Sequence, residues 1–201
     1  MVATNKKKMS TEIIVLGAML TALVVVLQLM GGFIRFGLFQ ISLVLIPIVI
    51  GAATCGVKVG AWLGLTFGIV VLANGDAAPF LAVDVFGTIF TVLLKGLLCG
   101  LVAALVFKAL EKKNRYVAVI AAAVICPVVN TGVFLLGCFV FFLDTITAWG
   151  QAAGHESVGQ YILFVLVGGN FLFELATNII LSPIVVRLLD IWGKKNAKKK
   201  A

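Results

Sequence analysis

Apolar residues fill this chain in six long runs, which short polar or glycine-rich breaks separate. A helix of about 20 apolar residues crosses a bilayer, and a soluble domain of this length would not need runs so long. The pattern therefore predicts an all-α membrane protein, in which one integral domain over residues 1–201 forms a bundle of six transmembrane helices. The predicted helices cover residues 11–30, 41–54, 57–73, 81–110, 116–143 and 161–192. The stretch 144–160 is predicted to be a polar loop.

Composition agrees with a membrane protein, since 62% of the residues are hydrophobic and only 12% are charged. The net charge of +8 could suggest nucleic acid, but the basic residues stand in short clusters beside the apolar runs. Fourteen of the 16 Lys and Arg residues lie before 11, at 58, from 108 to 115 or from 187 onward, whereas Arg35 stands alone between other runs. The positive-inside rule therefore predicts that both termini are cytoplasmic.

The sequence contains no common catalytic motif. G-x-S-x-G, H-E-x-x-H and the phosphate-binding G-x-x-x-x-G-K-[ST] are all absent, so we do not expect an enzyme, and any ATP hydrolysis must come from other proteins. His155 is the only histidine, and no C-x-x-C pair occurs among the cysteines. We therefore expect no metal and no cofactor, and we interpret the cysteines as small apolar side chains.

Charged and hydroxyl residues share one face of the predicted 81–110 helix. Asp84, Thr88, Thr91 and Lys95 are spaced by four, three and four residues, which places them on one stripe. A lysine in the middle of a membrane helix costs about 2.5–3.5 kcal/mol on insertion scales, so it should face a protein interior or an aqueous cavity. The stripe is therefore a candidate substrate-binding surface.

The last two predicted helices carry matching polar groups. Asn130 follows Pro127 in the 116–143 helix, and Asn170, Glu174 and Asn178 recur every four residues in the 161–192 helix. We expect Lys95 to be neutralised by Glu174 or Asp84, because an unpaired buried charge costs several kcal/mol. The alternative is an ion pair that only fixes the bundle.

Small residues dominate the first three predicted helices. Gly56, Gly60, Gly64 and Gly68 recur every four residues, so a neighbouring helix can approach this side closely. Close helix packing is a simpler interpretation of these glycines than a direct ligand role. This half of the chain carries little polarity apart from Gln28 and Thr66, which favours a smooth surface for a protein partner.

Two motifs resemble the substrate-binding S-components of energy-coupling factor (ECF) vitamin transporters, in the riboflavin-type group. Ala18-Met-Leu-Thr-Ala22 is similar to the A-x-x-x-A contact motif of that group. Leu45-Ile-Pro-Ile-Val-Ile-Gly51, followed by the glycine repeat, is similar to its second and third helices. At the turn between them, many relatives have Gly-Pro where this chain has Gly56-Val57.

This resemblance implies a vitamin-binding subunit in the bacterial cell membrane, which works with a transmembrane T-component and two cytoplasmic ATPases. It implies that the first three helices face the T-component, with partner-contact residues at Ala18, Ala22, Gly56, Gly60 and Gly64. It also implies that Asp84, Asn130 and Asn170 lie near the ligand.

Lys95 and Glu174 depart from the riboflavin-type pattern. They leave open a carboxylated, hydroxylated vitamin such as pantothenate, because Lys95 could meet its carboxylate. Two other classes of function remain possible on the sequence alone. One is a solitary secondary transporter that uses the charges of Lys95, Asp84 and Glu174 for proton coupling, and the other is a structural membrane scaffold.

Overall fold

Helices account for nearly all of the described chain. The computed structural model describes residues 11–31, 35–36, 39–40, 43–155, 157–162 and 167–198, with only the backbone described at 35–36, 39–40, 169–170 and 188–198. The helices are α1 (Thr11–Gly31), α2 (Leu45–Cys55), α3 (Val57–Ala73), α4 (Ala78–Leu81), α5 (Val85–Leu110), α6 (Arg115–Phe141), α7 (Leu143–Ala152), α8 (Val158–Tyr161) and α9 (Gly169–Lys198). The strands β1 (Arg35–Phe36) and β2 (Phe39–Gln40) form one short antiparallel ladder.

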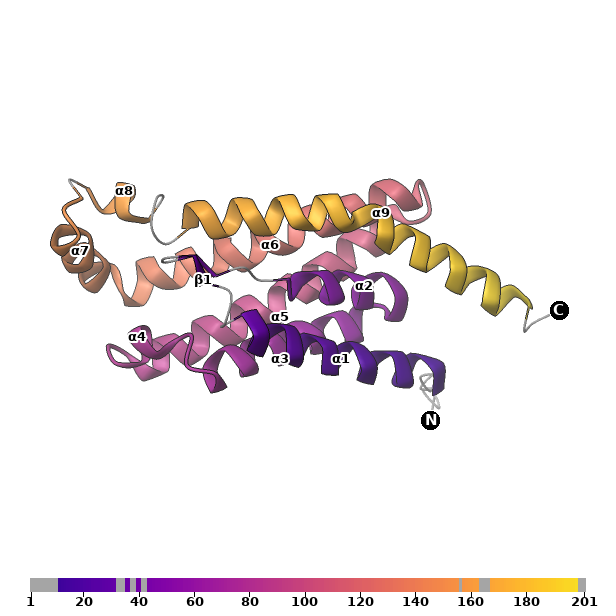
Figure 1. Ribbon diagram of the computed structural model, residues 1–201, viewed down its shortest axis with the longest axis horizontal. Helices are drawn as coiled ribbons and strands as arrows, with labels where there is room; N and C mark the ends of the chain where they lie inside the picture. The colour runs from indigo at the N-terminus through magenta and orange to yellow at the C-terminus, as the bar shows by residue number, and fades with distance from the viewer. Residues whose placement is uncertain are drawn as a thin grey trace, which may run out of the picture.

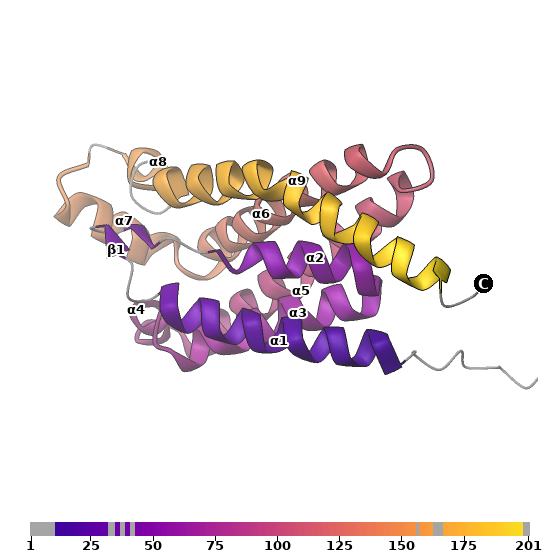
Figure 2. The same cartoon turned by 45° about the vertical axis from the view of Figure 1, so that its right-hand side comes forward.

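The prediction of an all-α membrane bundle is confirmed. Three helices, α1, α5 and α6, are long and apolar enough to cross a membrane, and α2 and α3 are shorter apolar helices. Together with α9 they follow the order of the six predicted helices. The helix α2 lies between α1 and α9 and also contacts α3, α5 and α6 (Figure 2).

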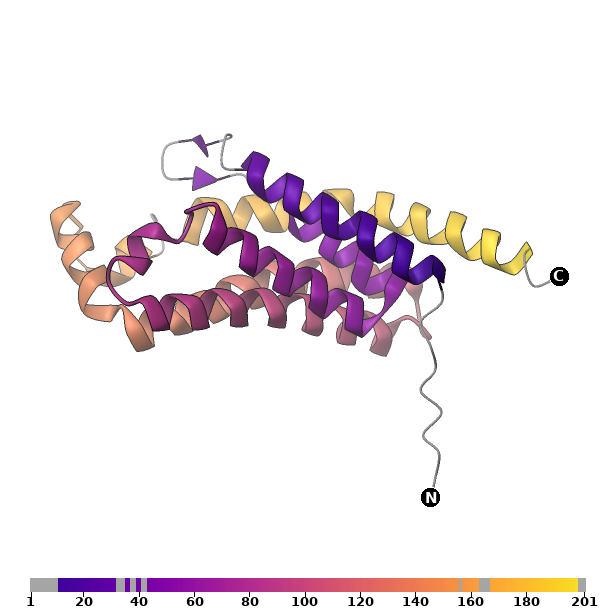
Figure 3. The same cartoon turned by 90° about the horizontal axis from the view of Figure 1, so that it is seen from below.

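The bundle has two chemically different ends (Figure 1). One end, which we call the basic end, holds the start of α1, the α2–α3 turn, the α5–α6 connection and the last turns of α9. Lys58, Lys108 and Arg115 belong to it. The other end, which we call the α7 end, holds α4, α7 and α8, and the β1–β2 ladder also lies toward it (Figure 3). The positive-inside rule predicts that this basic end faces the cytoplasm.

Two predicted helix boundaries need correction. The predicted 81–110 helix is divided, because α4 forms a separate turn with Pro79 at its start and α5 begins only at Val85. Asp84 lies between them with extended backbone, φ −144° and ψ 109°, and is the N-cap of α5. The last predicted helix is longer than expected, since α9 continues past 192 to Lys198, and residues 163–166 near its predicted start lie outside the described part of the chain.

The predicted polar loop 144–160 is wrong, because α7 and α8 occupy most of it. Ile146 is fully buried within α7, and Gly150 packs against the Tyr161 ring. Ile146 joins Phe142 and Ile162 in an apolar cluster, and Trp149 packs against that cluster. Burial of one apolar face therefore makes this segment helical despite its polar composition.

Helices α3 and α5 pack with backbone against backbone. A Cβ atom on Gly64 would overlap the Gly96 carbonyl oxygen, and one on Gly60 would lie 2.9 Å from the Gly100 oxygen. The same register continues to Gly68, whose Cβ would lie 2.8 Å from the Val92 oxygen. The glycine repeat therefore serves packing inside the chain, as the simpler interpretation of the sequence predicted.

This contact predicts a large difference between two glycine substitutions. Gly64→Ala should destabilise the protein by about 1–3 kcal/mol, because the added methyl group forces α3 away from α5. Gly132→Ala, on α6, is the matched control, since a Cβ there meets nothing within 4 Å. Thermal unfolding in detergent should show a lower midpoint for Gly64→Ala alone. Equal midpoints for the two variants would contradict the packing described here.

Helix α2 is short, and this shapes the interior of the bundle. Its 11 residues span about 16 Å, roughly half of a bilayer core of about 30 Å. It joins α3 at the basic end through Gly56, whose φ of +85° favours glycine, and it occupies only that half of the bundle (Figure 1). Because Leu45, Ile48 and Val49 are buried there, α2 fills the interior of that half, and the interior toward the α7 end is left to side chains of the other helices.

Candidate functional site

Polar side chains gather inside the bundle between two apolar clusters. One cluster surrounds α2 and includes Cys99, Cys126 and Val186, and the other surrounds Phe142 near α7. The residues between them, which we call the polar layer, are Thr88, Thr91, Lys95, Asn130 and Glu174. They come from three helices and belong to neither apolar cluster.

Lys95 projects between two aromatic rings. Its Nζ atom lies 5.6 Å from the centroid of Phe67 on α3 and 5.3 Å from that of Phe134 on α6. A cation over an aromatic face within about 6 Å is attracted by the ring, which partly compensates for the loss of water. The Lys95 side chain is partly buried, and its ammonium group lies between these two rings inside the bundle.

Glu174 is the strongest electrostatic partner of Lys95. Its side chain on α9 is only 8% exposed, and the Asn130 side chain on α6 lies beside it. Of the two carboxylates considered as partners from the sequence, the structure therefore favours Glu174 over Asp84 as the group that compensates the charge of Lys95. The interaction joins α5, α6 and α9.

Two buried polar atoms of the polar layer have no hydrogen-bond partner among the described residues. They are Thr91 Oγ1 and Asn130 Oδ1, on side chains that are 4% and 7% exposed. Buried polar groups are nearly always satisfied, and an unpaired one costs about 1–3 kcal/mol. Unpaired groups beside a lysine and a glutamate are the arrangement that a polar ligand would complete.

Gly137 fixes the position of the Thr91 hydroxyl. A Cβ atom on this α6 residue would overlap the Thr91 side chain, so only glycine lets α6 approach α5 so closely at this level. The close approach buries the Thr91 side chain against the α6 backbone. No spacing or motif connects these two residues, which are 46 positions apart.

Asp84 lies away from Lys95, at the α7 end. It precedes Lys95 by 11 residues, which is about 16 Å along the helix axis. A Cβ on Gly87 would lie 2.5 Å from Asp84 Oδ2 and 2.7 Å from the Phe141 ring, so the carboxylate folds over the start of α5. Thr88 Oγ1 donates a hydrogen bond of 2.6 Å to the Asp84 carbonyl oxygen. The predicted stripe is therefore continuous, but its acid and its lysine do not meet.

The polar stripe of α9 runs further than the sequence interpretation suggested. Glu174, Asn178 and Ser182 are all buried, and Ser182 Oγ donates a hydrogen bond of 2.8 Å to the Asn178 carbonyl oxygen. Ser182 completes the four-residue spacing and could have been found from it. Asn170 lies on the first turn of α9, but its side chain is outside the described part of the chain.

Sequence reasoning missed the contacts that hold the turn after α3. Gln28, which is buried near the end of α1, donates a hydrogen bond of 2.7 Å to Asp76 Oδ2. Asn74 Nδ2 donates to the same oxygen at 2.8 Å, and the Asp76 backbone N–H donates to Asn74 Oδ1 at 3.1 Å. Asp76 also acts electrostatically on Lys95, although more weakly than Glu174 does.

The aromatic neighbours of Lys95 were also missed. Phe134 follows Asn130 by four residues, so helical spacing could have placed it on the same face. Phe67 carried no such signal, because it is one apolar residue among many in α3. At the α7 end, Phe80 of α4 packs edge-on against Phe134, Phe142 and Trp149 at centroid distances of 5.6, 5.1 and 5.5 Å.

The residues predicted to contact a protein partner fall into two groups. Ala18 and Ala22 are exposed on α1, and Gly56 is exposed at the α2–α3 turn. Gly60 and Gly64 are instead buried, since α5 of the same chain covers them. We therefore leave these two glycines out of the partner surface that is proposed below.

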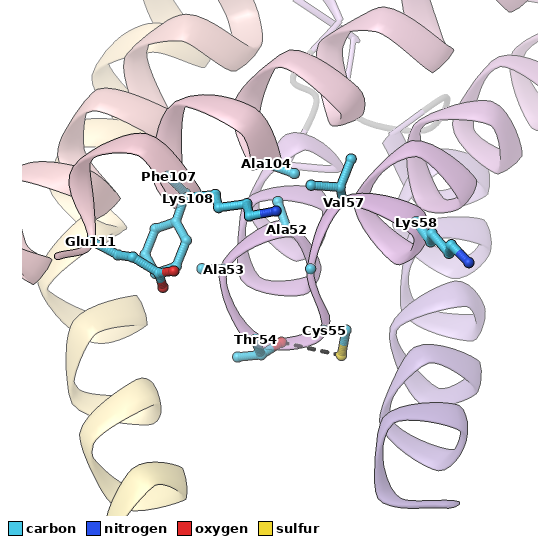
Figure 4. Close-up of a pocket in the computed structure, with 11 residues that line it drawn as sticks. Ala52, Ala53, Thr54, Cys55, Val57, Lys58, Ala104, Phe107, Lys108 and Glu111 are labelled. Atoms are coloured by element: carbon cyan, nitrogen blue, oxygen red, sulfur yellow. Dashed lines mark hydrogen bonds between the residues drawn. The ribbon is translucent and has the colours of Figure 1, made fainter. Parts of the chain in front are cut away.

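A groove of about 450 Å³ opens at the basic end (Figure 4). Residues of the α2–α3 turn line it together with Phe107, Lys108 and Glu111 of α5, and the Lys58 side chain points away from it. Gly56 borders it, but no member of the polar layer does. The groove is therefore separate from the candidate ligand site.

Comparison with known proteins gave one match. The model of a family described as "ECF transporter, substrate-specific component" matches residues 12–189, which is most of the chain. No curated protein and no solved structure matched. The matched range includes the polar layer and the exposed face of α1.

Proposed function

The chain belongs to the family of ECF transporter substrate-specific components, and from this membership we propose that it binds a water-soluble vitamin, such as riboflavin or pantothenate, for import. The family is one of substrate-binding transport subunits rather than of enzymes. The ligand site that we propose is the polar layer with its neighbours Asp84 and Asn170. The single observation that carries this assignment is the pair of unpaired buried atoms, Thr91 Oγ1 and Asn130 Oδ1.

Each polar group would have a separate task in this site. Lys95 can donate to an oxygen of the ligand. The ionised Glu174 carboxylate and the amide oxygen Asn130 Oδ1 can only accept hydrogen bonds. Phe67 and Phe134 provide apolar walls on either side of the Lys95 ammonium group. A mostly apolar cavity with a few converging polar groups is typical of small-molecule sites.

Energy for import would come from partner proteins, a T-component and two ATPases in the bacterial cell membrane. Ala18 and Ala22 place two small side chains on the exposed face of α1, among larger apolar ones such as Met19 and Leu23, so a partner helix could approach closely at this point. Gly56 adds a second contact point at the basic end. The ligand site and this partner surface use different helices.

Reconstitution tests the proposed function. Liposomes that contain the chain with a T-component and two ATPases should take up the vitamin only when ATP is present on the side of the membrane that the ATPases face. Liposomes with the chain alone should bind the vitamin and not accumulate it. Ion-driven uptake by the chain alone would instead support the solitary secondary transporter that the charges of Lys95, Asp84 and Glu174 left open.

A further inference from the structure

The charges of the polar layer balance one another. Lys95 and Glu174 are each other's main charged neighbours, and both lie inside the bundle between apolar clusters. The pair has zero net charge when the lysine is protonated and the glutamate ionised. It also has zero net charge if the proton passes from one group to the other.

A ligand with a net charge would disturb this balance. An anion at Lys95 would leave the Glu174 carboxylate uncompensated, and a cation at Glu174 would leave the lysine uncompensated. An uncompensated buried charge costs several kcal/mol, so a charged ligand would lose much of what its contacts contribute. Asp76 is a minor influence on this balance, because it acts on Lys95 more weakly than Glu174 does, and its carboxylate is held in the turn after α3 by Gln28 and Asn74.

The unpaired atoms add a requirement on hydrogen bonding. Asn130 Oδ1 can only accept, so the ligand must offer it an N–H or O–H group. The Lys95 ammonium lies over two rings that accept weakly at best, so it can still donate to a ligand oxygen. Thr91 Oγ1 can take either role.

We infer that this site selects a ligand of zero net charge, neutral or zwitterionic, which presents a carbonyl or similar oxygen to Lys95 and an N–H or O–H group to Asn130. The inference rests on the proposed function and narrows it to one class of substrate. Of the two vitamins named above, it favours riboflavin, which is neutral, over pantothenate, which carries a carboxylate.

Matched probes isolate the effect of charge. Pantothenol is a neutral analogue of pantothenate, and nicotinamide is a neutral analogue of nicotinate. Binding of all four to the full chain in nanodiscs should be measured for the wild type, Glu174→Gln and the control Glu111→Gln. Glu111 is exposed at the basic end, so its variant should behave like the wild type.

The wild type should prefer the neutral member of a pair by at least tenfold, and Glu174→Gln should reverse the preference by removing the negative charge beside Lys95. A wild-type preference for the anion overturns the inference, as does the absence of a preference for the neutral member in either pair. A reversal that also occurs in Glu111→Gln overturns it too. The proposed function fails separately, if the purified chain retains no small molecule and supports no uptake with its partners.

Discussion

Lys95→Met should lower the affinity for the transported small molecule by roughly 10- to 100-fold. A hydrogen bond from a charged donor contributes about 1.5–3 kcal/mol, and each 1.4 kcal/mol corresponds to tenfold in affinity. The substitution preserves the apolar stem between Phe67 and Phe134 and removes only the ammonium group. Isothermal titration with the ligand identified from the purified protein measures the change. Lys108→Met is the matched control, because Lys108 is exposed on the same helix and lies at the basic end.

A second variant separates ligand binding from bundle stability. Lys95→Met alone leaves the buried Glu174 without its main compensating charge, which should lower the free energy of unfolding. The double variant Lys95→Met with Glu174→Gln removes both charges and should recover most of that stability. If the pair only fixes the bundle, the double variant will bind ligand like the wild type. If Lys95 contacts the ligand, the double variant will be stable and still bind weakly.

Replacing Ala18 and Ala22 together by leucine should reduce recovery of the T-component complex more than tenfold. Both alanines are exposed on α1, and helices associate closely in membranes where small residues line the contact. Leucine side chains would hold the partner helix away. Co-purification of the tagged chain with its partner subunits measures the loss, and Ala176→Leu on the exposed face of α9 is the control.

Ligand affinity provides the second readout for these α1 variants. It should stay within twofold of the wild-type value, because α5, α6 and α9 supply the polar layer and α1 does not. Undiminished complex formation would show that this part of α1 does not contact the T-component. A parallel loss of ligand affinity would show that leucine at these positions disturbs the fold.

Much of the fold followed from local pattern. Apolar runs of membrane length predicted the presence and order of the main helices. The four-residue spacing of Gly60, Gly64 and Gly68 predicted a close helix contact. The sequence could not name the partner helix of that contact. The helix that packs against these glycines is the one that carries Gly96 and Gly100, which lie 32 positions from Gly64 and 40 positions from Gly60.

The ends of the helices were harder to predict. Asp84 has the spacing of a helical stripe residue, but its extended backbone makes it the cap before α5. The segment at 144–160 is polar by composition, and only the burial of Ile146 against Phe142 and Ile162 shows why it is helical. In both places tertiary contacts outweigh the local signal.

The candidate site was predictable in its charges and not in its geometry. A lysine within an apolar run must have compensation, so Lys95, Glu174 and Asn130 could be named from the sequence. The aromatic rings around Lys95 come from α3 and α6, and no periodicity connects Phe67 with Phe134. Likewise, the hydrogen bond between Gln28 and Asp76 joins residues 48 positions apart.

Native mass spectrometry of the gently purified chain tests the central proposal most directly. We expect the wild type to carry one small molecule per chain, and we expect Asn130→Leu to be folded and empty, because leucine removes the unpaired oxygen and fills its space. A bare wild-type mass would contradict the account, and so would equal ligand occupancy in the wild type and in Asn130→Leu.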